Sequence, residues 1–227
     1  MSDAGFITQE GVLTPLKGLR RTAARRMMTA WQAPVFHLTV EVDMTEASLV
    51  KQCVPGATVT DVFVAASAQA LLAVPSLNAH VGDDELTLFP HANVGIAVAT
   101  DNGLTVPVIH GADVLSLSEI ATRRRDVVQR ARARALVMDD VTGGTFTISN
   151  LGMMAIDRFD AILNVPQAAI LAIGSTRRRY VWRGDTAVWL PIAELTLTCD
   201  HRAADGAAGA TFLAALTAAL TKPIVPA

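Results

Sequence analysis

A strand pattern that runs directly into a helix pattern near the C-terminus is the feature that most constrains this chain. Residues 190–197 alternate apolar and polar side chains, and residues 207–220 form an alanine-rich run without proline. Alternation is typical of a half-buried strand, whereas an Ala- and Leu-rich run of this length favours a helix. Because only residues 198–206 connect the two, we expect the strand and the helix to be neighbours in the fold.

A histidine, His201, lies within that connection, where a rigid strand passes into a rigid helix. Four positions later Asp205 falls at the start of the helix, where a carboxylate also suits the positive end of the helix dipole. A single imidazole held in this way is a candidate general base, able to take a proton from an O–H or S–H group. An incidental histidine beside a helix-starting aspartate is the alternative that these residues alone leave open.

The rest of the chain predicts interspersed helices and strands. We expect helices over residues 19–32, 44–52, 62–74 (capped by Thr60 and Asp61) and 116–135. Strands are expected over residues 36–43, 145–149 and 167–174, with hairpins over 77–89, 93–109 (turning at 101–103) and 180–189. Hairpins outnumber crossovers in this pattern. It therefore predicts an α+β sandwich in which helices cover one face of a mostly antiparallel sheet.

Composition excludes several classes of protein. A net charge of −2 argues against nucleic acid as the partner, and no apolar run reaches the roughly 18 residues of a membrane span. Two cysteines are too few for a disulfide framework, and the N-terminus does not resemble a secretion signal, so we expect a cytoplasmic protein. The arginine runs 123–125 and 177–179 are expected to be solvated faces. Residues 1–13 are expected to form an N-terminal arm and residues 14–227 one domain.

A second candidate for chemistry is Ser149, which ends a predicted strand and precedes a glycine-containing turn. A hydroxyl at such a point can donate to the oxyanion of a tetrahedral intermediate, although a serine there can also simply satisfy the turn. No Gly-x-Ser-x-Gly elbow is present, and neither the five histidines nor the two cysteines have metal-ligand spacing. We therefore expect no metal site.

Several segments together resemble the catalytic domain of the dihydrolipoyl acyltransferases, the E2 components of 2-oxoacid dehydrogenase complexes. The most specific is the Asp-His-Arg-x-x-Asp-Gly run at 200–206, with Ser-Asn-Leu-Gly at 149–152 upstream; further similar segments are 15–21, 39–45 and 164–171. The resemblance covers about residues 14–220. It implies a fold like that of chloramphenicol acetyltransferase, and a homotrimer whose active sites lie between subunits.

The resemblance also implies roles for individual residues. His201 of one subunit would be the general base, and Ser149 of its neighbour would stabilise the oxyanion. Asp205 would hold the local frame, supported by Arg20 or Arg21. Acetyl-CoA (or another acyl-CoA) would be the co-substrate, and direct transfer would need no covalent enzyme intermediate.

Departures from the family pattern concern the acceptor side. His37 stands two positions downstream of the usual Pro-His-Phe histidine, whose place is taken by Val35; Asp160 replaces a small hydroxyl residue, and Val165 replaces a proline. We expect His37, Asp160 and Asn150 to bind substrate. Lys17, Lys51 and Lys222 are the only lysines, and none has the hairpin setting of a lipoyl lysine, so this chain is not expected to carry the lipoyl arm.

These observations lead to two enzymatic hypotheses and one non-enzymatic hypothesis. The first is a standalone acyltransferase that moves an acetyl group from acetyl-CoA to a hydroxyl of a small molecule, as tetronate-forming relatives in polyketide biosynthesis do. The alternative is the E2 catalytic core itself. A non-catalytic scaffold that keeps only the trimer is the third, and the intact set of His201, Ser149 and Asp205 argues against it.

Overall fold

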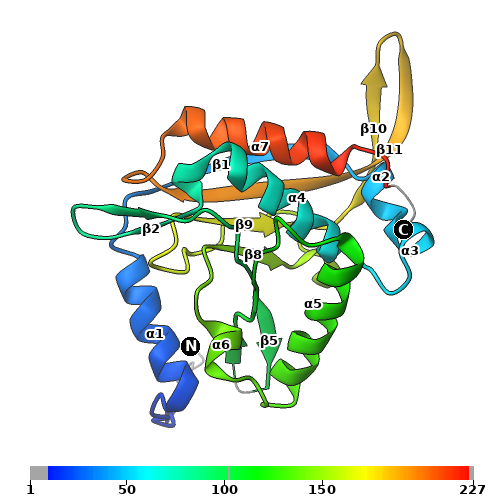
Figure 1. Cartoon of the computed structure of the whole chain (residues 1–227). Helices are drawn as coiled ribbons and strands as arrows, with labels where there is room; N and C mark the ends of the chain where they lie inside the picture. The colour runs from blue at the N-terminus through cyan, green and yellow to red at the C-terminus, as the bar shows by residue number, and fades with distance from the viewer. Residues whose placement is uncertain (1–9, 102, 225–227) are drawn as a thin grey trace, which may run out of the picture.

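The computed structural model describes residues 10–101 and 103–224, which build a seven-stranded sheet, two small two-stranded sheets and the helices packed around them (Figure 1). The helices are α1 Gly18–Ala30, α2 Thr45–Ser48, α3 Val50–Cys53, α4 Val59–Ala73, α5 Leu117–Arg132, α6 Met138–Val141 and α7 Gly206–Leu220, with 3-10 turns at Pro75–Leu77 and Gly152–Met154. The strands are β1 Val35–Asp43, β2 Ala79–Val81, β3 Leu86–Leu88, β4 Val94–Ile96, β5 Val98–Thr100, β6 Gly103–Thr105, β7 Val108–Ile109, β8 Phe146–Asn150, β9 Ala169–Ile173, β10 Arg177–Arg183 and β11 Thr186–Asp200.

The large sheet has the order β1-β11-β9-β8-β4-β7, and β10 pairs with the outer part of β11. Strand β8 is parallel to both of its neighbours, and the other strand pairs are antiparallel. The predicted mixed, mostly antiparallel sheet is therefore confirmed. Pairing of Val35 with Asp200 places the start of β1 beside the end of β11, so that two segments far apart in sequence meet at one end of the sheet.

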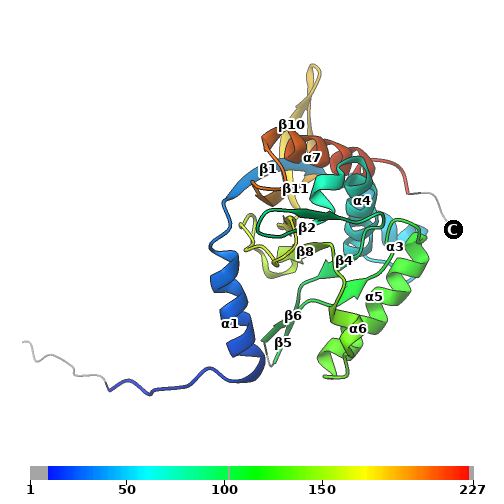
Figure 2. The ribbon, with the colours of Figure 1, turned by 60° about the vertical axis from the view of Figure 1, so that its left-hand side comes forward.

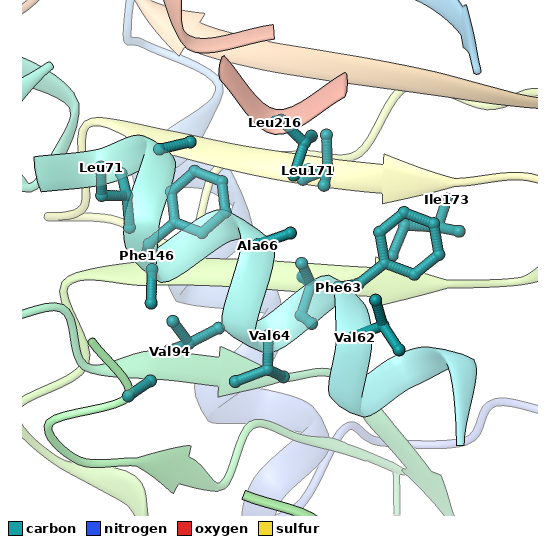
Figure 3. Packing of buried hydrophobic residues seen from close by; sticks show 14 of the residues in the cluster. Val62, Phe63, Val64, Ala66, Leu71, Val94, Phe146, Leu171, Ile173 and Leu216 are labelled. Carbon is teal, nitrogen blue, oxygen red and sulfur yellow. The ribbon is translucent and has the colours of Figure 1, made fainter. Parts of the chain in front are cut away.

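The core lies between this sheet and the helices α4 and α7, which pack on the same face (Figure 3). Leu71 of α4 lies beside Phe146 of β8, Leu216 of α7 lies beside Leu171 of β9, and all four side chains are at least 98% buried. Burial of side chains of this size stabilises the fold by about 2 kcal/mol each. The face of the sheet that carries α7 is thus fixed by dense apolar packing.

Helix α7 lies unusually close to the sheet because it contains Gly209. A Cβ added at Gly209 would lie 2.6 Å from Cδ1 of Leu38 on β1, a distance that ordinary packing does not allow. The close approach ties the first turns of α7 to β1 and β11. The turn that joins β11 to α7 is consequently held at both ends.

The final strand is longer than predicted. The expected strand at 190–197 and the second half of the expected hairpin at 180–189 are one continuous strand, β11, and β10 already begins at Arg177. Gly184 provides the positive φ of 58° that the tight turn between them needs. The outer part of this hairpin projects beyond the rest of the molecule (Figure 1).

The predicted hairpin over 93–109 forms, but each of its arms is broken in two. Strands β5 and β6 pair only with each other, whereas β4 enters the large sheet between β8 and β7. Pro107 lies at the break and has no N–H to donate to a ladder, although its carbonyl accepts from the N–H of Ile96. The next N–H, that of Ala97, donates to the carbonyl of Ile148 in β8. Asn102, in the predicted turn, lies outside the described residues.

Helix α4 begins three residues before its predicted start, because Thr58 rather than Thr60 is its cap. The backbone N–H and hydroxyl of Thr58 donate to Oδ2 of Asp61 at 2.7 and 2.9 Å. Asp61 also accepts from Arg124 of α5, with Nε at 2.9 Å from Oδ1, and both side chains are largely buried. The expectation that residues 123–125 form a solvated face is therefore wrong for Arg124.

We expect Asp61→Asn to lower the free energy of unfolding by about 3 kcal/mol, because it leaves the buried Arg124 charge without its partner. Urea unfolding followed by circular dichroism measures this effect. Asp126→Asn is the matched control, since Asp126 forms an exposed i,i+4 pair with Arg130 and its loss should cost less than about 0.5 kcal/mol. Equal losses in the two variants would contradict a structural role for the buried pair.

Candidate active site

His201 is the first residue after β11, in the turn that leads to α7, as the sequence predicts. Its backbone N–H donates to the carbonyl oxygen of Pro34 at 2.9 Å, which ties it to the segment before β1. Its ring lies against Phe36, with ring centroids 5.0 Å apart and the planes tilted by 56°. His201 is nevertheless exposed, so the imidazole is oriented by the fold and still accessible to a reactant.

The frame of this turn is an ion pair that sequence reasoning missed, between the residues on either side of His201. The Asp200 carboxylate is 1% exposed and accepts from the backbone N–H, Nε and Nη2 of Arg202 at 3.0, 3.0 and 2.6 Å. The hydrogen bond to Asp200 also raises the pKa of the Arg202 guanidinium. The sequence signal for this pair was an acidic residue directly before the histidine and a basic residue directly after it.

Asp205 caps α7, since its Oδ1 accepts from the N–H of Ala208 at 2.9 Å. It holds the end of the His201 turn through the helix rather than by contact with the imidazole. Within the described part of the chain it forms no ion pair with Arg20 or Arg21. Both arginines lie on α1, which extends away from the sheet (Figure 2). The supporting role of these arginines stays a prediction.

Ser149 lies near the end of β8 and is half-buried. It is level with Ala172 of β9, which in turn is level with Thr196 of β11. From Thr196 to the end of β11 the chain advances more than about 13 Å, and β8 is two strands, or about 10 Å, from β11. Ser149 and His201 of one chain therefore lie at well-separated places on the same sheet.

Asn150, beside Ser149, uses its side chain within the chain. Its Oδ1 accepts from the N–H of Gly152 at 2.9 Å, and its Nδ2 donates to the Thr60 hydroxyl at 3.4 Å. These bonds shape the turn that follows Ser149. Contact of Asn150 with a substrate stays a prediction.

His37 and Asp160, which were predicted to bind substrate, line one cavity. We call it the β1 cavity; it has a volume of about 470 Å³, and its walls include Trp31, Val35, His37, Asp160, Ile162 and Thr198. They come from the end of α1, from β1 and β11, and from the segment between β8 and β9. His201 does not line the cavity, but its neighbour Asp200 pairs with Val35, so the two features share one end of the sheet.

Other chemistries have little support in this site. Burial raises the pKa of the Cys199 thiol to about 12, which leaves almost no thiolate near neutral pH. Over residues 10–101 and 103–224, no group of three or more His, Cys, Asp or Glu side chains could hold a metal ion. In the same residues no helix has the length and apolarity to cross a membrane.

Comparison with protein families decides where the chain belongs. The family model described as 2-oxoacid dehydrogenases acyltransferase (catalytic domain) matches residues 8–226. The chain belongs to this family. A member is the acetyltransferase component of the pyruvate dehydrogenase complex of Rickettsia bellii, which is 33% identical over 225 residues. The match covers 95% of this chain and 54% of that protein, so the chain spans about half the length of the relative.

Solved structures of the family share the fold. The Azotobacter vinelandii dihydrolipoamide acetyltransferase has a TM-score of 0.88 at 29% identity, with 94% of this chain and 92% of that chain covered. Its crystallographic and enzymatic investigation concerns the role of a serine, a histidine and an asparagine in its catalytic mechanism. The histidine follows the serine by 52 residues, and the asparagine follows four residues later. A chloramphenicol acetyltransferase, 14% identical with a TM-score of 0.56, covers 87% of this chain and 94% of its own and has the same fold.

These comparisons favour the second of the two enzymatic hypotheses. The curated relatives are named as dihydrolipoyllysine-residue acetyltransferases, and none of those compared supports a standalone acetyltransferase for a tetronate. The predicted resemblance to the E2 catalytic domain and to the chloramphenicol acetyltransferase fold is confirmed.

Proposed function

We propose that this chain is the catalytic domain of a dihydrolipoyl acyltransferase, which moves an acyl group between CoA and a dihydrolipoyl thiol. The observation that carries the proposal is the spacing of three residues: Ser149, His201 and Asp205 are separated by 52 and 4 positions. The serine, histidine and asparagine studied in the Azotobacter enzyme have the same spacing, with asparagine in place of Asp205.

In the proposed reaction His201 acts as the general base. It removes the proton from the dihydrolipoyl S–H, and the sulfur attacks the thioester carbonyl of acyl-CoA. The Ser149 hydroxyl donates to the oxyanion of the tetrahedral intermediate, a contribution commonly of order 10²–10³ in rate. When the intermediate collapses, the C–S bond to CoA breaks and the CoA sulfur takes the proton back from His201. No group on the enzyme is acylated.

The active site is proposed to lie between two copies of the chain. His201 and Ser149 are too far apart along the sheet of one copy for both to contact the same carbonyl. A neighbouring copy in a homotrimer would bring its Ser149 to the His201 of the first.

The function is tested by incubating the protein with acetyl-CoA and dihydrolipoamide, and following free CoA together with the mass of the acceptor. We expect S-acetyldihydrolipoamide to form. A tetronate with a primary hydroxyl serves as the competing acceptor. Acetylation of that alcohol without any transfer to dihydrolipoamide would overturn the proposal in favour of a standalone O-acetyltransferase.

A further inference from the structure

The β1 cavity combines apolar walls with a few polar side chains, the usual composition of a small-molecule site. Trp31, Val35 and Ile162 contribute apolar surface, whereas His37, Thr198 and Asp160 contribute polar atoms. Its volume of about 470 Å³ lies within the range of pockets that hold small ligands or parts of larger ones. The cavity is therefore large enough for the end of a substrate.

His37 is held in place on the cavity wall. Its Nδ1 and the hydroxyl of Thr198 on the paired strand are 2.9 Å apart, and the two residues are directly opposite in the β1–β11 register. In the part of the chain that the structure describes, Nε2 has no hydrogen-bond partner. One ring nitrogen thus fixes the imidazole, and the other is available to a ligand.

Asp160 gives the cavity its charge. It is the only acidic side chain among the lining residues, and the lining includes neither Lys nor Arg. The nearby Arg158 points elsewhere, with its Nε 4.0 Å from the carboxylate of Glu194. Over residues 10–101 and 103–224, Asp160 has no hydrogen-bond or ion-pair partner of its own. A bound ligand would therefore meet an unneutralised carboxylate.

We propose that the β1 cavity is the acceptor subsite, and that Asp160 selects uncharged acceptors that end in an amide or hydroxyl over anionic ones. This inference rests on the proposed function. A ligand N–H or O–H can donate to Asp160, and the ring of His37 can bond a second polar atom of the same end group. A carboxylate or phosphate in the cavity would be repelled by Asp160, so CoA, with its phosphates, must approach from another side.

The position of the cavity fits an acceptor. Val35 and His37 on one wall pair with Asp200 and Thr198, and His201 follows Asp200 directly. Because Phe36 and His37 face opposite sides of β1 and the His201 ring lies against Phe36, an elongated acceptor whose end group lies in the cavity would reach His201 of the same copy around the end of the sheet.

Dihydrolipoamide and dihydrolipoate form a matched pair of substrates, because they carry the same two thiols and differ in the charge of the far end. We expect the wild-type protein to prefer dihydrolipoamide in kcat/KM. Asp160→Asn should reduce this preference about five-fold, with the change in KM rather than kcat and with the KM of acetyl-CoA unaltered. Asp185→Asn, at the distant tip of the β10–β11 hairpin, removes the same charge and should leave the preference unchanged.

Direct binding keeps the inference separate from the proposed reaction. Trp31 lines the cavity, so its fluorescence in a Trp182→Phe, Trp189→Phe background reports occupancy by the oxidised, unreactive lipoamide and lipoate. We expect the wild type to have a lower Kd for lipoamide than for lipoate. Asp160→Asn should reduce the ratio of the two Kd values. Equal binding of the two in the wild type, or a difference that survives Asp160→Asn, would overturn the selective role even if acetyl transfer is observed. Selective binding without acetyl transfer would support the subsite and reject the proposed function.

Discussion

Replacement of His201 by alanine is expected to lower kcat for acetyl transfer from CoA to dihydrolipoamide by about 10²–10⁴, the usual contribution of a general base. The reason is chemical rather than structural. The exposed His201 ring contacts Phe36, whereas it is the backbone N–H that bonds to Pro34, so the turn should keep its shape in the variant. Initial rates of CoA release at saturating acetyl-CoA measure the loss.

Two controls make this result specific. Thermal unfolding of His201→Ala should agree with the wild type to within a few degrees, because little buried surface is lost. His110→Ala removes a different exposed histidine, whose Nε2 is hydrogen-bonded to the carbonyl of Asp139 far along the chain, and should retain activity. A His201→Ala protein that transfers acetyl groups at the wild-type rate would show that another group is the base.

Much of the architecture follows from local patterns in the sequence. Helix α5 begins at Leu117, one residue after its predicted start, because Ser116 and Glu119 form a capping box. The step from β11 into α7 was also predictable, since alternation gives way to an Ala- and Leu-rich run within nine residues. Such signals involve neighbours in sequence, and they specify where an element starts more reliably than what it pairs with.

The structural features that the sequence did not predict depend on contacts between distant segments. The break of the 93–109 hairpin reflects the pairing of β4 with β8, fifty residues further along the chain. The burial of Arg124 depends on Asp61, which lies on another helix. Neither partner can be named from a local window, because each choice is made by the tertiary fold.

The candidate site shows the same division. His201 could be found from its place between a strand and a helix, whereas the ion pair of Asp200 with Arg202 that frames it is evident only in the folded structure. His37 and Asp160 were candidates for separate reasons, and only the fold brings them to one cavity. The distance between His201 and Ser149 is the reverse case, because two residues expected to act together lie apart in one chain.

That separation predicts an unusual form of complementation. Ser149→Ala and His201→Ala proteins should each be nearly inactive, whereas mixed trimers isolated by two different affinity tags should recover about one-third of the wild-type activity. Each of the three interfaces of a trimer joins His201 of one copy to Ser149 of the next copy. A mixed trimer therefore has one interface with both residues intact, whether it contains two copies of the one variant or two copies of the other. The specific activity of the doubly tagged fraction is the measurement.

Mixing the wild type with a Ser149→Ala, His201→Ala double variant provides the opposite test. A site shared between copies leaves one active site in a trimer with two wild-type copies and none in a trimer with a single wild-type copy. A site contained within one copy would instead give activity in proportion to the wild-type copies, and the two single variants would not complement each other at all. Absence of complementation in mixed trimers would therefore place the oxyanion donor of His201 within its own chain and remove Ser149 from the mechanism.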